Sequence, residues 1–170
     1  PVTQLMAVVK ANGYGHGAVE SARAALHGGA TFLGVATVSE GRELRDAGIE
    51  APILVLGSSA PEEALLASDL DVAIGVGDPD QIERLFGILV QNPPVAPLRV
   101  HLKIDTGMRR FGVTPDQAIA LAQKLRERPQ VQLSGVYSHF AESDAGQQER
   151  LSQQLDIFRA TVHRIDQLGI

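Results

Sequence analysis

Short apolar runs alternate with longer segments of helical spacing along the whole chain. Six compact apolar runs, several of them rich in β-branched residues, predict buried strands at 5–9, 31–36, 51–57, 71–76, 97–104 and 133–140. Segments in which apolar residues recur every three or four positions predict helices at 18–27, 39–47, 61–67, 79–90, 115–127 and 147–168. The pattern therefore indicates six strand-then-helix units.

Glycine and proline mark several of these boundaries. Gly28 and Gly29 are expected to end the first helix, and Gly48 the second, for which Ser39 is the expected N-cap. Pro61 fits the first turn of the third helix. Because no hairpin signal separates the strands, we expect parallel strands joined by helices.

Two architectures fit this α/β pattern, namely an open doubly wound sheet and a (β/α)8 barrel of the TIM type. No G-x-G-x-x-G follows the first strand, which weakens the dinucleotide-binding version of the open sheet. A barrel needs eight units, and the sequence stops after a sixth helix, where a seventh strand would begin. We therefore expect the chain to be part of a longer protein.

Composition narrows the functional classes. The formal net charge of −5 gives no basic footprint for nucleic acid. The absence of cysteine removes disulfides and thiolate chemistry and fits a reducing compartment, so we expect a cytoplasmic protein. No apolar run approaches the roughly 20 residues of a membrane span, and the five histidines lack metal-ligand spacing, so we predict no membrane partner and no metal.

Several chemically versatile side chains stand where predicted strands end. Lys10 follows the first strand, Leu56 ends the third, Lys103 lies at the end of the fifth and His139 at the end of the sixth. In parallel β/α proteins these ends meet on one rim, where functional groups gather. We therefore expect these residues to share a site.

The stretch VVKANGYGHG combines the Lys10 amine with a glycine-rich turn. A lysine shielded from water can have a lowered pKa and act as a nucleophile or base. The glycines allow close approach of a ligand, and Tyr14 offers a phenol to a phosphate or carboxylate. The alternative is an ordinary glycine-rich turn with a strand-end lysine.

The fifth strand alternates apolar and polar residues. Its apolar face holds Leu98, Val100, Leu102 and Ile104, and its polar face holds Arg99, His101, Lys103 and Asp105. In a barrel, helices cover the apolar face, so the polar row should point inward, where charges must be paired or bound to a ligand. The alternative is an edge strand with one solvated face.

The loop DTGMRRFG brings two arginines to the same rim. The guanidinium of Arg109 or Arg110 would suit a planar carboxylate or an aromatic phenolate oxygen. The alternative is a pair of solvated surface arginines.

Together, VVKANGYGHG, KIDTGMRRFG and YSHFAESD, with VSEGRELRDAG and ILVLG, make this chain resemble the alanine racemases. These are fold type III enzymes that depend on pyridoxal 5'-phosphate. The resemblance spans the chain and implies that residues 1–170 form about six units of a (β/α)8 barrel that binds this cofactor. The family's C-terminal β-domain has no counterpart in these residues.

The resemblance also implies roles for single residues. Lys10 matches the lysine that holds the cofactor as a Schiff base and moves the α-proton on one face. Tyr14 matches the residue that hydrogen-bonds the cofactor phosphate, and Leu56 lines the ring. Arg110 matches the arginine that reaches the phenolate oxygen and the substrate carboxylate, and His139 the histidine packed against the pyridine ring.

Two further positions follow from the same resemblance. Lys103 matches a lysine that is often carbamylated by CO2, and the new negative charge would steady Arg110. Arg109 stands where the family often has glycine. The family's second base is a tyrosine of the C-terminal domain, usually supplied by the partner subunit, so we expect a homodimer and an inactive isolated 1–170.

The expected activity is interconversion of L- and D-alanine, a small-molecule substrate. Three alternatives stay open. A serine or broad-specificity racemase would keep the fold and cofactor. A non-catalytic barrel would bind pyridoxal phosphate without racemisation. A purely structural β/α domain would leave the clustering of Lys10, Lys103, Arg110 and His139 to chance.

Overall fold

The computed structural model describes residues 3–141 and 148–169. Six parallel strands form one sheet in the order β1-β2-β3-β4-β5-β6. The strands are β1 (Met6–Val8), β2 (Phe32–Val35), β3 (Ile53–Ser58), β4 (Ala73–Val76), β5 (Leu98–Lys103) and β6 (Val131–Tyr137). All six lie within, or within two residues of, the segments expected from the sequence.

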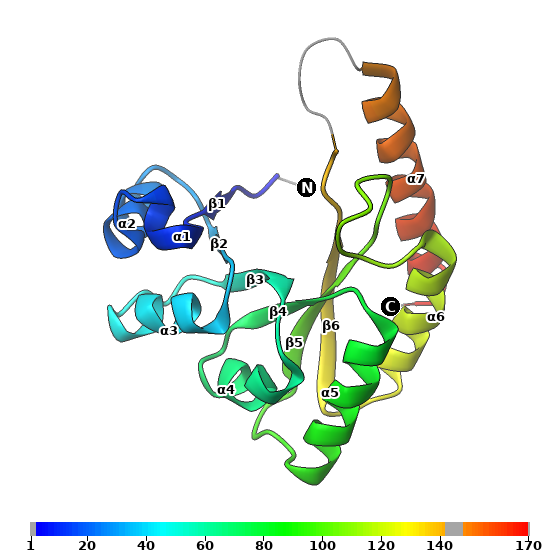
Figure 1. The fold of residues 1–170 in the computed structure, drawn as a ribbon, viewed down its shortest axis with the longest axis horizontal. Helices are drawn as coiled ribbons and strands as arrows, with labels where there is room; N and C mark the ends of the chain where they lie inside the picture. Colours follow the sequence, from blue (N-terminus) through cyan, green and yellow to red (C-terminus); the bar gives the residue numbers. More distant parts are fainter. Residues whose placement is uncertain (1–2, 142–147, 170) are drawn as a thin grey trace.

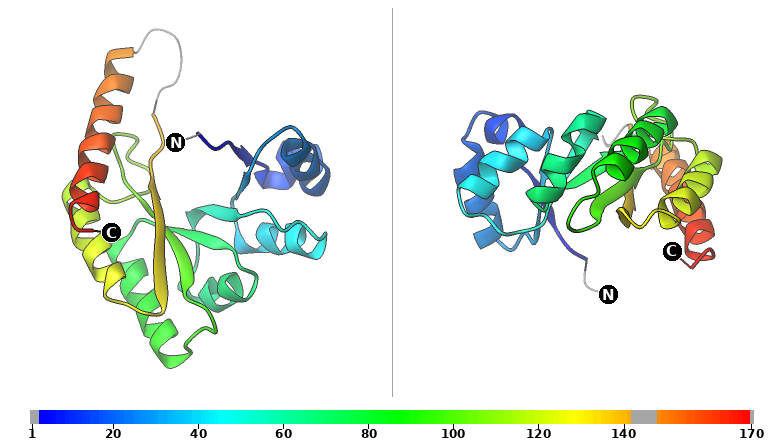
Figure 2. Two further views of the ribbon diagram at one scale, coloured as in Figure 1. Left: turned by 180° about the vertical axis from the view of Figure 1, so that it is seen from behind. Right: turned by 90° about the horizontal axis from the view of Figure 1, so that it is seen from below.

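Helices join successive strands and lie around the outside of the curved sheet (Figures 1 and 2). They are α1 (Lys10–Tyr14), α2 (Ala18–His27), α3 (Val38–Asp46), α4 (Ala64–Asp69), α5 (Pro79–Gln91), α6 (Pro115–Arg126) and α7 (Gln148–Asp166), with a single 3-10 turn, η1 (Pro61–Glu63), before α4. The short α1 packs on α2, and α6 packs on both α7 and β6.

The strand order decides between the two architectures. Each strand pairs with its predecessor and its successor in the sequence, so the order never reverses. A doubly wound sheet requires such a reversal at its switch point, and that alternative is wrong. The prediction of an α/β fold with six units of a TIM-type barrel is confirmed. Within the described residues, β1 and β6 are the two edges of the sheet.

The main core lies between the sheet and its helices. On β5, the predicted apolar face is completely buried, since Leu98, Val100, Leu102 and Ile104 each have 0 % exposure. The helices close this layer with small and aliphatic side chains such as Ala118 and Leu125 of α6. The polar side chains of β5 are thereby directed to the inner side of the sheet, as the alternation predicted.

Several predicted boundaries need correction. Ser39 does not cap α3: the hydroxyl of Thr37 accepts a hydrogen bond from the Glu40 backbone N–H, because Thr37 has the extended conformation that an N-cap requires. Residues 61–67 are not one helix, since the 3-10 turn precedes α4. Strand β6 ends at Tyr137, so His139 lies beyond it. The predicted start of the last helix at residue 147 lies outside the described residues.

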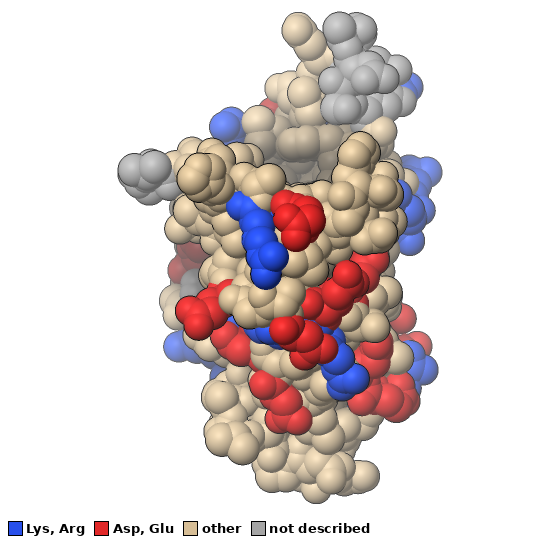
Figure 3. Space-filling model, turned by 90° about the vertical axis from the view of Figure 1, so that its left-hand side faces the viewer, with Lys and Arg blue, Asp and Glu red and all other residues tan. Residues whose placement is uncertain are grey.

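The surface mixes both signs of charge. On the face formed by α1, α2 and α3, acidic and basic side chains are interspersed (Figure 3). Within residues 3–141 and 148–169, no helix is both long enough and apolar enough to cross a membrane.

Candidate active site

One cavity lies at the carboxyl ends of β1, β2, β3, β5 and β6. It encloses about 410 Å³ and is lined by Val8, Lys10, Tyr14, Ala36, Leu56, Gly57, Lys103, Arg110, Tyr137, Ser138 and His139. All six residues for which the sequence suggested a role therefore share one cavity. This convergence follows from the parallel strand order, which places successive strand ends on one rim. The individual roles of these residues stay predictions.

Lys10 enters the cavity from a left-handed turn. Ala11, Asn12, Gly13 and Tyr14 all have positive φ values, between 51° and 62°. This conformation is unfavourable for residues other than glycine, and the glycine-rich pattern predicted a turn here but not its left-handed form. Gly13 is required for a second reason, because a Cβ at this position would lie 2.6 Å from Ser21 Oγ.

The cavity is lined by several basic side chains and by no acidic ones among the described residues. Lys10, Lys103, Arg110 and His139 line it, and none of its described lining residues is Asp or Glu. Burial lowers the pKa of His139, and the positive charges of Lys103, Arg110 and Lys10 lower it further. Such a cavity suits an anionic ligand. No three or more His, Asp or Glu side chains within the described ranges are grouped to hold a metal ion.

Lys103 is buried, with 6 % exposure. Its Nζ lies 5.4 Å from the ring centre of Phe111 and 5.3 Å from that of Tyr137. Burial lowers the Lys103 pKa, and the neighbouring Arg110 lowers it further, against an opposing effect of Asp105. No carboxylate in the described part of the chain forms an ion pair with Lys103, so two aromatic rings replace an acidic partner.

The rest of the polar row on β5 serves other purposes. Arg99 forms an ion pair with Asp71 at 2.7 Å, away from the cavity. The carboxylate of Asp105 accepts hydrogen bonds from the backbone N–H groups of Gly107 and Arg109 and thereby shapes the following loop. His101 lines a separate inner cavity beside Phe32. Of the four polar residues of this row, only Lys103 lines the cavity.

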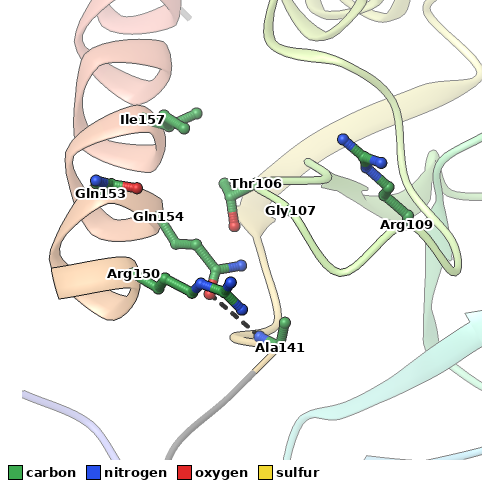
Figure 4. A pocket seen from close by; sticks show the side chains of 8 residues that line it. All are labelled: Thr106, Gly107, Arg109, Ala141, Arg150, Gln153, Gln154 and Ile157. Carbon is green, nitrogen blue, oxygen red and sulfur yellow. Dashed lines mark hydrogen bonds between the residues drawn. The ribbon is translucent and has the colours of Figure 1, made fainter. Parts of the chain in front are cut away.

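The two neighbouring arginines diverge. Arg110 lines the cavity with Lys10, whereas Arg109 lines a different cavity between the loop after β5 and α7 (Figure 4). Arg109 has a φ of 55°, which turns the chain between the two side chains. In the second cavity, the side-chain oxygen of Gln154 accepts a hydrogen bond from the Ala141 backbone N–H at 3.2 Å, so α7 holds the segment after β6 (Figure 4).

Two residues near the site escaped the sequence analysis as positioning groups. Tyr137 donates a hydrogen bond from its hydroxyl to the backbone oxygen of Leu56 at 2.8 Å, and its burial raises the pKa of this hydroxyl. Glu40 accepts hydrogen bonds from the backbone N–H groups of Ala11 and Ala36. A Thr-x-x-Glu pattern at 37–40 is the available sequence signal for Glu40, but it predicts a capping box and not a contact with the Lys10 turn.

Comparison with known proteins gives a consistent result. The model of the family described as "Alanine racemase, N-terminal domain" matches residues 1–170. The chain is 42 % identical over 171 residues to an alanine racemase of Nostoc sp., covering 100 % of this chain but 44 % of that protein. The chain thus spans less than half the length of such relatives.

Solved structures agree. An alanine racemase from Bacillus anthracis with bound L-Ala-P superposes with a TM-score of 0.89 at 34 % identity, over 99 % of this chain and 43 % of that one. A histidine racemase from Leuconostoc mesenteroides superposes with a TM-score of 0.85 at 29 % identity, over 92 % of this chain and 42 % of that one. The same barrel segment therefore occurs in racemases named for different amino acids.

Proposed function

This chain belongs to the alanine racemase family, by way of that family's N-terminal domain, and we propose that the protein interconverts L- and D-alanine with pyridoxal 5'-phosphate held beside Lys10. The observation that carries the proposal is the basic cavity, in which Lys10, Lys103, Arg110 and His139 meet with no acidic residue among the described lining. The cofactor phosphate, its phenolate oxygen and the substrate carboxylate are all anionic and complement this charge.

The chemistry of the lining residues fits the cofactor. Lys10 would hold the cofactor through its primary amine, by a covalent link to the cofactor aldehyde in which the aldehyde oxygen would leave as water with both amine hydrogens. The Tyr14 side chain, 61 % exposed at the mouth of the cavity, has a hydroxyl free to donate to the phosphate. Leu56 offers an aliphatic surface and His139 an imidazole ring against which an aromatic ring could pack.

When bound, pyridoxal phosphate supplies an electron sink for the pair left behind as an amino acid loses its Cα proton. In this proposal, the Lys10 amine would remove the proton from one enantiomer, or deliver it to form that enantiomer, always on its own face of the Cα atom. Arg110 binds the substrate carboxylate through its guanidinium. His139 stays neutral at pH 7 because its pKa lies below the ordinary value, so it packs on the ring without adding a charge.

We include carbamylation of Lys103 in the proposal. The ammonium first releases one proton to solvent, and the neutral amine nitrogen then bonds to the carbon of CO2 and releases a second proton, so that overall a negative charge replaces a positive one. The lowered pKa of Lys103 favours the neutral form that this step requires. A carbamate beside Arg110 would relieve the repulsion that now lowers the Lys103 pKa.

The second base is proposed to come from outside residues 1–170. Lys10 lies on one side of the cavity, and racemisation needs a proton donor on the other face of the Cα atom. Tyr137 is a poor candidate, because its hydroxyl is engaged by the Leu56 carbonyl. We propose that a C-terminal β-domain supplies a tyrosine as this base, and that it does so from the partner subunit of a homodimer. We also propose that the enzyme is cytoplasmic. Residues 1–170 in isolation should therefore not racemise alanine.

The test uses the complete protein, purified and loaded with pyridoxal phosphate. Conversion of L-alanine into D-alanine, followed by chiral chromatography, is the expected result. Serine and histidine serve as competing substrates, and faster racemisation of either would replace alanine in the proposal. Stable binding of the cofactor without racemisation of any amino acid would support the non-catalytic alternative instead.

A further inference from the structure

The turn that carries Lys10 and Tyr14 is intrinsically unfavourable. Three of its residues other than glycine would each prefer negative φ, yet Ala11, Asn12 and Tyr14 have φ values of 51°, 53° and 54°. Backbone in this region persists only where surrounding groups hold it.

One carboxylate fastens the start of the turn. Glu40 Oε1 accepts a hydrogen bond from the Ala11 N–H at 2.8 Å, and Oε2 accepts one from the Ala36 N–H at 2.6 Å. Ala11 directly follows Lys10, and Ala36 directly follows β2. Glu40 therefore ties the Lys10 turn to the neighbouring strand end through two charge-assisted bonds, which are stronger than neutral ones.

Glu40 is itself fixed in place. Its backbone N–H donates to the N-cap hydroxyl of Thr37 in the first turn of α3. A negative charge is favourable at this end of a helix. Glu40 is not among the residues that line the cavity. At the far side of the turn, the side-chain oxygen of Asn12 accepts from the Ala18 N–H at 2.9 Å.

We propose that Glu40 is a positioning residue for Lys10: its carboxylate holds the left-handed turn in the conformation that presents the amine and Tyr14 to the cofactor. This inference rests on the proposed function. The structural argument is that a single side chain satisfies the first N–H of the strained turn and anchors it to a rigid strand end. Loss of the carboxylate should release the turn while the sheet and α3 persist.

The experiment compares Glu40→Gln and Glu40→Ala in the complete protein, with Glu43→Ala as the control. Glu43 lies on the same helix and is exposed. An amide keeps one oxygen acceptor, so Glu40→Gln can satisfy one of the two N–H groups and Glu40→Ala neither. Both variants and the control are prepared without cofactor and checked for folding by circular dichroism.

Two readouts are needed. Hydrogen–deuterium exchange, read by mass spectrometry, should accelerate by at least about tenfold in residues 9–14 of Glu40→Ala, as expected for lost bonds to a charged group, but stay unchanged in α5. The rate of covalent capture of added pyridoxal phosphate, trapped with borohydride, should fall by a similar factor. Glu40→Gln should be intermediate, and Glu43→Ala should match the wild type.

The outcomes separate the two proposals. Wild-type exchange and wild-type capture in Glu40→Ala would overturn the role of Glu40, and if that variant fails to fold, the same result in folded Glu40→Gln would overturn it. Accelerated exchange with an unchanged capture rate would also contradict it, because the turn would then not govern the amine. If the wild-type protein captures no cofactor, the proposed function fails, and exchange at residues 9–14 still decides whether Glu40 holds the turn.

Discussion

Two lysines enter the same cavity from opposite parts of the sheet, and their settings differ. Lys10 follows β1 on a short left-handed turn that the Glu40 carboxylate fastens to the end of β2. Lys103 ends β5, is almost fully buried, and has its Nζ between the rings of Phe111 and Tyr137. The Lys10 amine is thus positioned by a turn with unfavourable positive φ values, whereas the Lys103 amine is surrounded by side chains.

The difference indicates that the ends of β1 and β5 have different functions. A turn at the mouth of a cavity can deliver an amine to a ligand and can let it move. An amine enclosed by two rings, with a pKa lowered by burial and by Arg110, is suited to stay in place and tune its neighbour. We therefore propose covalent chemistry for Lys10 and electrostatic support for Lys103, and the substitutions below test this proposal.

The largest effect is expected from Lys10→Ala. Loss of the nucleophile should abolish covalent capture of pyridoxal phosphate and lower alanine racemisation by about 10⁴-fold or more. Lys103→Ala should keep covalent capture, because its amine is not the one that reacts. Lys124→Ala, which removes an exposed lysine paired with Glu83, is the control. Equal loss of covalent pyridoxal phosphate capture in Lys10→Ala and Lys103→Ala would contradict the different roles proposed for the two lysines.

The next effect concerns the enclosure around Lys103. A methyl group at Gly75 would lie 2.3 Å from Tyr137 Oη, so Gly75→Ala should destabilise the protein by about 2 kcal/mol through overpacking. Tyr137→Phe should cost about 1 kcal/mol through loss of the bond to Leu56. In the double variant, urea unfolding should show a loss of unfolding free energy smaller than the sum of the two single losses. Strictly additive losses would mean that the Tyr137 hydroxyl does not limit the space beside Gly75.

These cases also show what the sequence could reveal. The alternation on β5 predicted that Lys103 faces inward, since a two-residue period fixes the face of every side chain. Parallel strands likewise predicted that Lys10, Leu56 and Lys103 share a rim. Contacts between distant segments were out of reach: the hydrogen bond between Tyr137 and Leu56 joins residues 81 positions apart, and no local pattern encodes it.

Local conformation was only partly predictable for a similar reason. A glycine-rich stretch indicated a turn after Lys10 but not its left-handed form, and the Ala11 N–H of this turn donates to a carboxylate 29 residues further along the chain. The observed N-cap, Thr37, lies two residues before the predicted one, Ser39, which is within the usual uncertainty of helix ends. The separation of Arg109 from Arg110 depends on one positive φ value.

A third prediction uses His139 to report the charge of Lys103. The His139 pKa is lowered by burial and then by Lys103, Arg110 and Lys10. Lys103→Met removes a positive charge, so protonation becomes easier and the pKa should rise toward the ordinary value of about 6.5. NMR titration of the cofactor-free complete protein measures it. His101, whose pKa is lowered by burial and Arg99, should not move and is the internal control.

The same titration addresses carbamylation. In bicarbonate buffer, conversion of Lys103 into a carbamate replaces a positive by a negative charge, which should raise the His139 pKa more than Lys103→Met does. A bicarbonate-dependent rise in the wild type that is absent in Lys103→Met is the expected pattern. An identical response in both proteins would remove Lys103 as the modified residue.

The smallest effect is expected at Arg109. Its φ of 55° is unfavourable for a side chain, so Arg109→Gly should stabilise the folded protein by about 0.5 kcal/mol, after the greater backbone freedom of glycine in the unfolded chain is subtracted. Ala11→Gly is the matched change in the Lys10 turn. Urea unfolding of both variants shows whether the two left-handed positions carry similar strain, and destabilisation by Arg109→Gly would contradict this reading.

The assignment of the two lysines is tested most directly by locating the covalent bond. The complete protein is loaded with pyridoxal phosphate, reduced with borohydride, digested and sequenced by mass spectrometry. The pyridoxyl group is predicted on Lys10, with Lys103 free of it, because the turn at the mouth of the cavity presents one amine and the two rings enclose the other. A pyridoxyl group on Lys103, or on neither lysine, would contradict the assignment.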